Sequence, residues 1–337
     1  MKRSRIVYFL FLFSGITALI YEVVWTRMLT LAFGHTVFSV SIVLASFMAG
    51  LGFGSYFSGH AINHIGGKKT QSDSSSLSRE FSEDLGTSSL LLIYGWIEIA
   101  LFLLCLVVSL ILFKFSVIYS WFSFFVPESI VVQNIFKSFL AFILMFIPAS
   151  LMGATLPIIS QYYITDNIKL DARLGLLYGI NTFGAALGCL LAGFFLIGNF
   201  GVLQTVLAAT VLNLFVGISA IRIYQESVES SRGLRFPHFT IPKISWEGDQ
   251  WLWIVVSFVC GFTALSYEVL WTRLLIFSTS STVYSFSMML GVFLIGISLG
   301  SFLVVAVFRS SLNLRTVLIL LQAGIGLYVI GSLYNME

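Results

Sequence analysis

The sequence predicts an all-α polytopic membrane protein whose second part begins as a copy of its first. The composition is 58% hydrophobic and only 10% charged over 337 residues. Soluble domains carry roughly 25% charged residues, so most of this chain's surface is expected to face lipid. The apolar runs also recur, and each reaches the ~20 residues that a helix needs to cross a bilayer. An internal repeat in register is the third observation, and it divides the chain.

Nine apolar runs are predicted to be membrane spans. They cover residues 6–31, 36–60, 89–113, 131–163, 174–198, 202–222, 251–277, 282–308 and 314–333. The first run is too long for the core of a signal peptide and lacks a small-residue cleavage pattern, so we expect it to be retained. Pro148 and Pro157 are expected to kink or interrupt the fourth run. Residues 115–129 are interpreted as an interfacial segment, with a short half-span as the alternative.

Basic residues cluster in the loops expected on one side of the membrane. They stand before the first run and after the second, fourth, sixth and eighth: Lys2, Arg3, Arg5, Lys68, Lys69, Arg79, Lys169, Arg173, Arg222, Arg232, Arg235, Lys243, Arg309 and Arg315. The other side offers mainly Lys114 and Lys137. This asymmetry predicts a cytoplasmic N-terminus in a cell membrane, such as a bacterial inner membrane. The serine-rich segment 68–89 is interpreted as a mobile cytoplasmic loop.

The internal repeat joins "GITALIYEVVWTR" at residues 15–27 to "GFTALSYEVLWTR" at residues 261–273. Without a gap it extends over residues 15–55 and 261–301, where 20 of 41 positions are identical. Six predicted spans precede the second copy, so both copies have the same orientation in the membrane. The sequence therefore predicts parallel halves related by an axis along the membrane normal, as in major-facilitator transporters.

The repeat predicts three regions. Residues 1–222 form a six-helix transmembrane half, residues 223–250 a cytoplasmic linker, and residues 251–337 a partial second half with three helices. If one half takes about 246 residues, which is the repeat offset, then 91 residues of the second half are present. We therefore expect the chain to be a fragment, with a diverged second half as the alternative.

Two glutamates occupy equivalent places in the repeat. Glu22 lies about 24 Å along its predicted helix at ~1.5 Å per residue, beyond the membrane midplane, and Glu268 stands at the same depth. A carboxylate there costs at least ~2.5–3.5 kcal/mol on insertion scales unless it is paired or faces water. We interpret the glutamates as an acidic pair that faces a shared central cavity and binds a cation or takes a proton. In the alternative, each bonds to a neighbouring helix.

Arginines and tyrosines flank this pair. Arg27 and Arg273 follow the glutamates by five residues, roughly 140° around the helix, which makes a bond within one helix awkward. They are interpreted as outer-leaflet anchors, with an ion-pair role as the alternative. Tyr21 and Tyr267 stand beside the glutamates, each four residues before a tryptophan. Packing explains such aromatic walls, and they would also suit an organic cation.

The remaining candidates are weaker. Glu98 is a third buried acid, and Asn181 could bond across helices. Three glycine pairs are expected to be helix-packing positions: Gly50 and Gly54, Gly184 and Gly188, and Gly296 and Gly300. Cys105, Cys189 and Cys260 lie in apolar runs without a CxxC spacing, which indicates neither a disulfide framework nor a metal site. No catalytic residue, cofactor or nucleic-acid partner is expected.

Four segments resemble the membrane part of the fused spermidine-synthase/major-facilitator family. They are "SGITALIYEVVWTRMLTLAFG", "TVFSVSIVLASFMAGLGFGSYFSG", "PASLMGATLPIIS" and "LGLLYGINTFGAALGCLLAGFFL". The resemblance covers nearly the whole chain apart from the polar loops. Residues 59–71, "GHAINHIGGKKTQ", resemble a weakened major-facilitator loop signature. Gly59, Gly66 and Lys68 fit it, whereas Asn63, His64 and Gly67 stand where that signature has Asp, Arg and Arg.

In that family the membrane part is usually attached to a soluble aminopropyltransferase domain of Rossmann type. This chain shows no glycine-rich loop after a strand and no polar stretch long enough for that domain, so we expect it not to synthesise spermidine itself. Two functions remain open at this point. The chain is either a transporter of a polyamine or another organic cation in the lipid bilayer, or a membrane anchor for an aminopropyltransferase domain.

Overall fold

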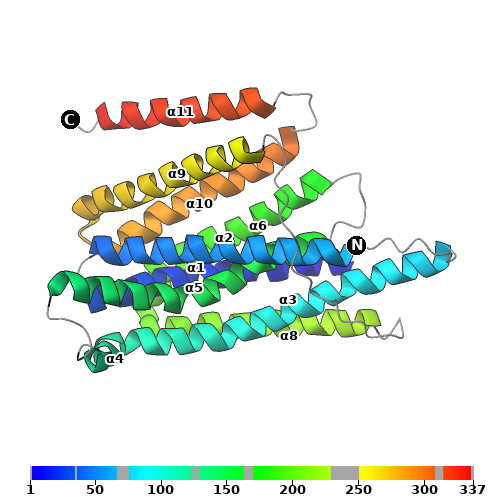
Figure 1. Ribbon diagram of the computed structural model, residues 1–337, viewed down its shortest axis with the longest axis horizontal. Coiled ribbons are helices and arrows are strands. Elements are labelled where there is room, and N and C mark those ends of the chain that lie inside the picture. Colours follow the sequence, from blue (N-terminus) through cyan, green and yellow to red (C-terminus); the bar gives the residue numbers. More distant parts are fainter. Residues whose placement is uncertain are drawn as a thin grey trace.

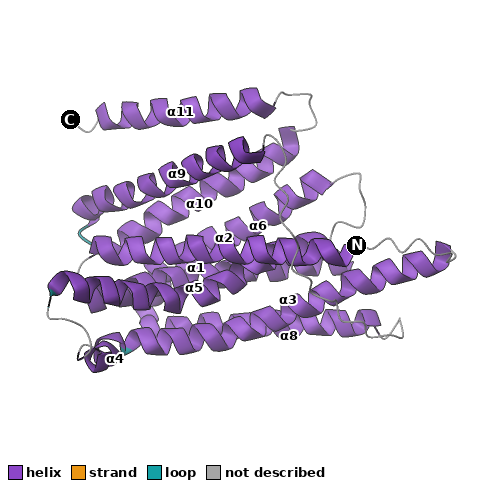
Figure 2. Ribbon diagram, viewed as in Figure 1, coloured by secondary structure: helices purple, strands orange, loops and turns teal. Residues whose placement is uncertain are grey.

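The computed structural model describes residues 2–34, 36–66, 76–122, 124, 129–162, 170–228, 250–307 and 314–334. The described elements are helices laid side by side (Figure 1 and Figure 2). They are α1 (Lys2–Phe33), α2 (Thr36–Gly66), α3 (Ser76–Phe113), α4 (Phe115–Phe122), α5 (Ile130–Tyr162), α6 (Leu170–Leu191), the π-helix η2 (Ala192–Leu196), α7 (Ile197–Phe200), α8 (Val202–Val228), α9 (Gln250–Thr279), α10 (Thr282–Val307) and α11 (Leu314–Tyr334). No strand occurs in these residues, so the all-α prediction is confirmed for them.

Eight helices of the described part are long and apolar enough to cross a membrane, as a multi-pass membrane protein requires. They follow the first eight predicted spans. The ninth predicted span is α11, whose described apolar stretch, Thr316–Ser332, is shorter. Several basic residues of the charge analysis lie outside the described residues: Lys68, Lys69, Lys169, Arg232, Arg235, Lys243 and Arg309.

Two helix ends differ from the sequence-based expectation, and one helix expected to be kinked or interrupted is continuous. α3 begins at Ser76, so residues 76–88 are helical rather than a loop, and this extension projects past the neighbouring helices in Figure 1. Its Leu, Arg and Glu residues favour a helix in water as well as in lipid. α8 continues to Val228, into the predicted linker. α5 runs unbroken through Pro148 and Pro157 because neighbouring helices can compensate the backbone bonds that proline removes.

The contact between α6 and α1 depends on two glycines. Gly184 and Gly188 of α6 meet the backbone carbonyls of Leu12 and Ile16 of α1. A Cβ atom at either glycine would overlap the facing backbone. Small residues at this spacing let two helix backbones approach closely, which is the main source of helix association in lipid.

The contact between α2 and α5 has the same glycine pattern as the contact between α6 and α1. Gly50 and Gly54 of α2 meet the backbone of α5 at Phe146 and Ser150. Each of these four residues is offset by 134 from its counterpart in the α1–α6 contact. α1 and α5 run in opposite directions in Figure 1. The two helix pairs are therefore inverted copies of one packing arrangement.

α3 and α8 complete the inverted arrangement. Gly95 lies against the carbonyl of Gly217 and the side chain of Ile221, while Gly217 lies against the carbonyl of Gly95 and the side chain of Ile99. The contact is thus symmetric between the two helices. Helices α1, α2 and α3 are consequently packed against α5, α6 and α8 as two inverted three-helix units.

α9, α10 and α11 lie on one side of this six-helix bundle (Figure 1). α10 packs mainly on α6, and the Ser298 hydroxyl donates a hydrogen bond to the Gly179 carbonyl at 2.9 Å. α9 packs on α10 and leaves most of its side chains exposed. α11 lies farthest out, where the Gln322 amide donates to the Cys260 sulfur at 3.3 Å.

The glycine pair on α10 differs from the two pairs on α2 and α6. Gly296 and Gly300 were expected to be packing positions, but no other atom lies within 4 Å of where their Cβ atoms would be. The reason is that no described helix lies against α10 in the place that α5 occupies against α2. Gly296 and Gly300 therefore do not make the close helix contact that the equivalent Gly50 and Gly54 make.

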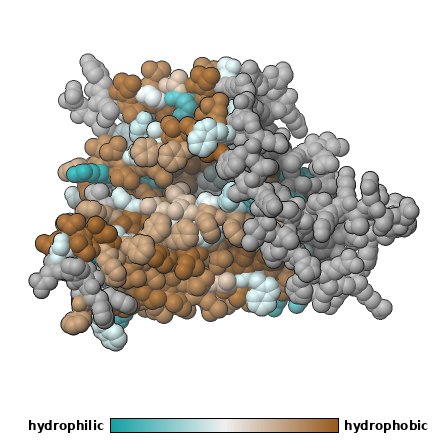
Figure 3. Space-filling model, viewed as in Figure 1, coloured by the Kyte–Doolittle hydropathy of each residue, from teal (hydrophilic) through white to brown (hydrophobic). Residues whose placement is uncertain are grey.

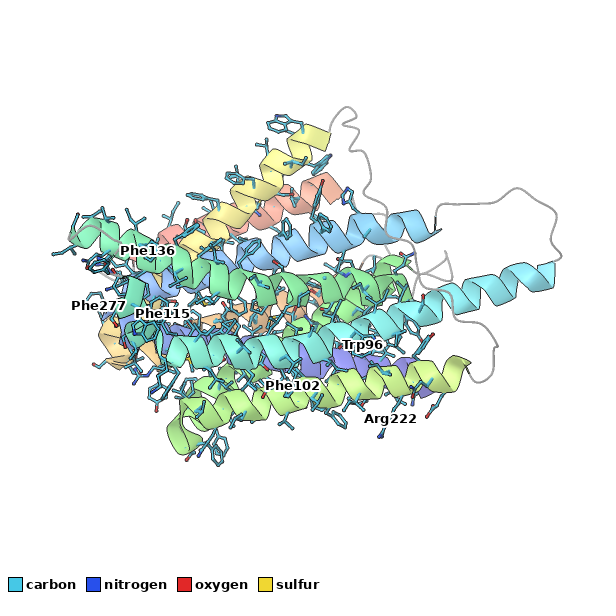
Figure 4. The ribbon with its side chains drawn as sticks, turned by 60° about the horizontal axis from the view of Figure 1, so that its bottom comes forward. Trp96, Phe102, Phe115, Phe136, Arg222 and Phe277 are labelled. Atoms are coloured by element: carbon cyan, nitrogen blue, oxygen red, sulfur yellow. The ribbon has the colours of Figure 1, made fainter. Side chains whose placement is uncertain are left out.

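The described surface has the polarity expected of a chain in lipid. Most of the described face shown in Figure 3 is hydrophobic. Figure 4 shows Phe115, Phe136 and Phe277 near the end of the bundle where α4 lies, and Arg222 on α8 toward the other end.

The variant Gly54→Ala is expected to destabilise the bundle by about 1–3 kcal/mol, because its methyl group would overlap the Ser150 carbonyl. Gly52→Ala is a matched control on the same helix, since no atom lies within 4 Å of its Cβ position. Thermal unfolding in detergent would compare them. A Gly54→Ala protein as stable as Gly52→Ala would contradict the close α2–α5 packing.

Candidate functional site

The two repeat glutamates lie close to each other although they come from different helices. Glu22 of α1 and Glu268 of α9 are near enough to interact electrostatically. Each is only 2% exposed. Among the described side chains of α9, only Glu268 and Thr272 are buried. This apolar helix therefore turns its polar side inward and its apolar side outward, as a helix in lipid does.

α6 and α10 close the site around this pair. The Cys189 thiol of α6 lies within electrostatic range of both glutamates, and it donates a hydrogen bond to the Ser287 carbonyl of α10 at 3.4 Å. Directly after α6 comes the π-helix η2, where a Cβ at Gly193 would overlap the Ser287 side chain. The π-helical turn and its glycine thus bring α10 against α6 beside the acidic pair. Single π turns inside helices occur often at functional sites.

Several polar atoms of this cluster are sealed without a hydrogen-bond partner. They are Glu22 Oε1, Glu268 Oε1, Thr272 Oγ1 and Ser287 Oγ. The equivalent threonines of the two repeat copies differ in their hydrogen bonds. The Thr26 hydroxyl donates to the Glu22 carbonyl at 2.8 Å, whereas the hydroxyl of its counterpart Thr272 has no partner. A buried polar atom without a partner costs about 1–3 kcal/mol. The cluster therefore has free capacity to hold a bound group.

The aromatic residues of α1 next to Glu22 in the sequence pack toward α3: Tyr21 interacts with Glu98 and Cys105, and Trp25 with Ser109. The rings of Tyr21 and Trp25 stack at a centroid distance of 5.6 Å and an angle of 27°. Trp25 is fixed by a hydrogen bond from its indole nitrogen to the Ser109 hydroxyl at 2.8 Å, whereas the buried Tyr21 hydroxyl has no partner. Their counterparts on α9, Tyr267 and Trp271, are half-buried. The ordered aromatic pair of α1 therefore adjoins α3 and Glu98 rather than the acidic pair.

The arginines do not neutralise the pair within the described residues. Arg27 is half-buried and Arg273 is exposed, and neither glutamate has an ion-pair partner in the described part of the chain. This agrees with the geometric argument against a bond within one helix. The acidic pair lies in the interior without a described counter-ion.

The other predicted residues lie apart from this cluster. Glu98 of α3 is completely buried and accepts a hydrogen bond from Ser14 of α1. Asn181 of α6 lies against Gly15 at the crossing of α6 with α1. The sequence analysis missed Asn213 of α8, which is 1% exposed and has both amide atoms without a partner. An asparagine within an apolar run was the available signal.

A separate cavity of about 310 Å³ opens among the ends of α1, α2 and α5. It is lined by Phe33, Phe38, Val131, Asn134, Ile135 and Ser138. Phe33 is eleven residues beyond Glu22, so the cavity is about 16 Å along α1 from the acidic pair at ~1.5 Å per residue. The described residues contain no group of His, Cys, Asp and Glu side chains that could hold a metal ion. The pair is therefore an enclosed acidic site without a described counter-ion, suited to a positively charged group.

Comparisons with protein-family models, curated proteins and solved structures found no match to this chain. The site is therefore interpreted from its own chemistry.

The isosteric variant Thr272→Val is expected to raise the unfolding free energy by about 1 kcal/mol, because it removes a buried hydroxyl that has no partner. Thr26→Val is the control from the other copy of the repeat, and it should lower stability slightly because it breaks an existing hydrogen bond. Thermal unfolding of the two variants in detergent would measure both effects. Equal losses in the two variants would show that the Thr272 hydroxyl is bonded after all.

Proposed function

We propose that this chain is the membrane module of a major facilitator-like transporter that binds a polyamine or another organic cation between Glu22 and Glu268. The observation that carries the proposal is the burial of these two carboxyl groups within electrostatic range of each other, without a described ion-pair partner. Two carboxylates cannot share an enclosed site cheaply unless a cation or proton joins them. A bound ammonium group would supply the missing charge and hydrogen-bond donors.

The fold offers two further supports for transport. Inverted three-helix units nested within parallel halves are the construction of major-facilitator proteins, in which substrates bind near the membrane midplane at the interface of the halves. Glu22 comes from the six-helix bundle and Glu268 from the repeated part, so the pair lies between these two portions of the chain. A site shared by two rigid units can open to either side when the units rock against each other.

The alternative role is a membrane anchor for an aminopropyltransferase domain. An anchor needs apolar helices but has no need for two apposed acids inside them. Buried ionisable residues in membrane helices are costly and are usually tied to a function. This difference favours transport and makes the two roles experimentally separable.

The test is uptake of labelled spermidine into liposomes that contain the purified protein. Glu22→Gln and Glu268→Gln should each reduce uptake about ten-fold or more, since one charge-assisted hydrogen bond of ~1.5–3 kcal/mol is lost. Glu226→Gln, which neutralises an exposed glutamate near the end of α8, should change it less than two-fold.

Full uptake by both site variants would overturn the role of the acidic pair. If the unmodified protein neither binds nor transports spermidine or a series of other organic cations, the anchor role is favoured instead.

A further inference from the structure

A third carboxyl group is enclosed within the six-helix bundle, away from the acidic pair. Glu98 of α3 is 0% exposed. The Ser14 hydroxyl of α1 donates to its Oε1 atom at 2.5 Å, whereas its Oε2 atom is buried without a partner. One carboxyl oxygen is thus held in place, and the other has an unused lone pair.

This group belongs to a different site from the acidic pair. Ser14 and Glu22 are eight residues apart on α1, which corresponds to about 12 Å along the helix at ~1.5 Å per residue. Glu98 also lies between α1 and α3, whereas the pair is enclosed by α1, α6, α9 and α10. The two sites share one element, helix α1.

The surroundings of Glu98 contain titratable groups but no described cation. Tyr94 and Cys105 of α3 and Tyr21 of α1 are the titratable side chains that interact with it. α5 and α8 also pack on α3. Their charged residues and tyrosines in the described part lie toward the helix ends: Lys137, Tyr162, Arg222, Tyr224 and Glu226. Figure 4 shows Arg222 on the outer side of α8.

The space at Glu98 suits a proton better than a larger cation. On one side, Gly95 of α3 is in backbone contact with α8. On the other, the Tyr94 hydroxyl bonds to the Leu10 carbonyl of α1 at 3.4 Å. An organic ammonium group would have to displace these helices, whereas a proton needs only the free lone pair of Oε2. Buried acids of this kind form the proton sites of many pumps and transporters.

We propose that Glu98 carries the coupling proton of this transporter, on Oε2, at a site separate from the cation site of Glu22 and Glu268. The inference rests on the proposed transport function. The proton adds to Oε2 from water when the bundle opens and returns to water on the other side, while Ser14 continues to donate to Oε1. Because α1 carries both Ser14 and Glu22, a shift of α1 on cation binding changes the Ser14–Glu98 contact.

The experiment uses Glu98→Gln, which keeps an acceptor oxygen for Ser14 and cannot carry a transferable proton. Purified protein in liposomes is assayed for spermidine accumulation driven by a pH gradient and for exchange of labelled against unlabelled spermidine without a gradient. Gradient-driven accumulation should fall about ten-fold or more, while exchange should stay within two-fold of the unmodified protein. Glu226→Gln, which neutralises an exposed acid near the end of α8, should retain accumulation.

Infrared spectroscopy supplies a readout that does not depend on transport. The carbonyl band of a protonated carboxylic acid should disappear in Glu98→Gln and persist in the Glu22→Gln/Glu268→Gln double variant. If the unmodified protein shows the Glu98-dependent band but does not transport spermidine, the transport function is refuted, whereas the conclusion that Glu98 is protonated stands. Three results would overturn the proton site. The first is unchanged accumulation in Glu98→Gln, and the second is an equal loss of accumulation and exchange in a folded Glu98→Gln protein. The third is an infrared band that Glu98→Gln leaves unchanged.

Discussion

The cost of placing a carboxyl group inside hydrocarbon is the constraint on which the rest of this structure depends. A charged side chain at the centre of a bilayer is unfavourable by several kcal/mol unless polar groups or ions compensate it. The chain nevertheless encloses Glu22, Glu98 and Glu268 within apolar helices. The α9 helix turns Glu268 and Thr272 inward and leaves its other described side chains exposed or half-buried. The polar interior is thus the most informative part of the protein, because lipid-facing positions require only apolar side chains.

Close helix packing encloses these groups. Glycines on α2 and α6 let those helices lie directly against the backbones of α5 and α1, and the same register occurs in both contacts. Such contacts are rigid, because a helix cannot shift there without meeting the carbonyls of its neighbour. The α6–α10 contact differs, since it includes a π-helical turn next to Cys189 and Ser287. Each glycine-packed helix pair can therefore move as a unit, while the irregular turn allows α10 to move relative to α6, as transport requires.

The sequence predicted the spans well because apolar length is set by bilayer thickness, and the repeat predicted that Glu22 and Glu268 would lie together. It could not predict the inverted packing, because the two contacts share only their glycines, while the residues that face them are dissimilar, as Ile16 and Ser150 show. The roles of Gly296 and Gly300 differed because packing depends on a neighbouring helix, which a repeat does not specify. Asn213 was missed although an asparagine within an apolar run was a usable signal, and the π-helical turn was missed because it depends on tertiary contacts that no local pattern records.

A double-mutant cycle on spermidine binding tests the central claim most directly. The dissociation constant would be measured by calorimetry for the unmodified protein, for Glu22→Gln, for Glu268→Gln and for the double variant, all in lipid nanodiscs. If one cation bridges both carboxyl groups, the double variant should bind only slightly more weakly than either single variant, with a coupling energy of at least ~1 kcal/mol. Losses that add independently, or no loss in any variant, would contradict a shared cation site between the two copies of the repeat.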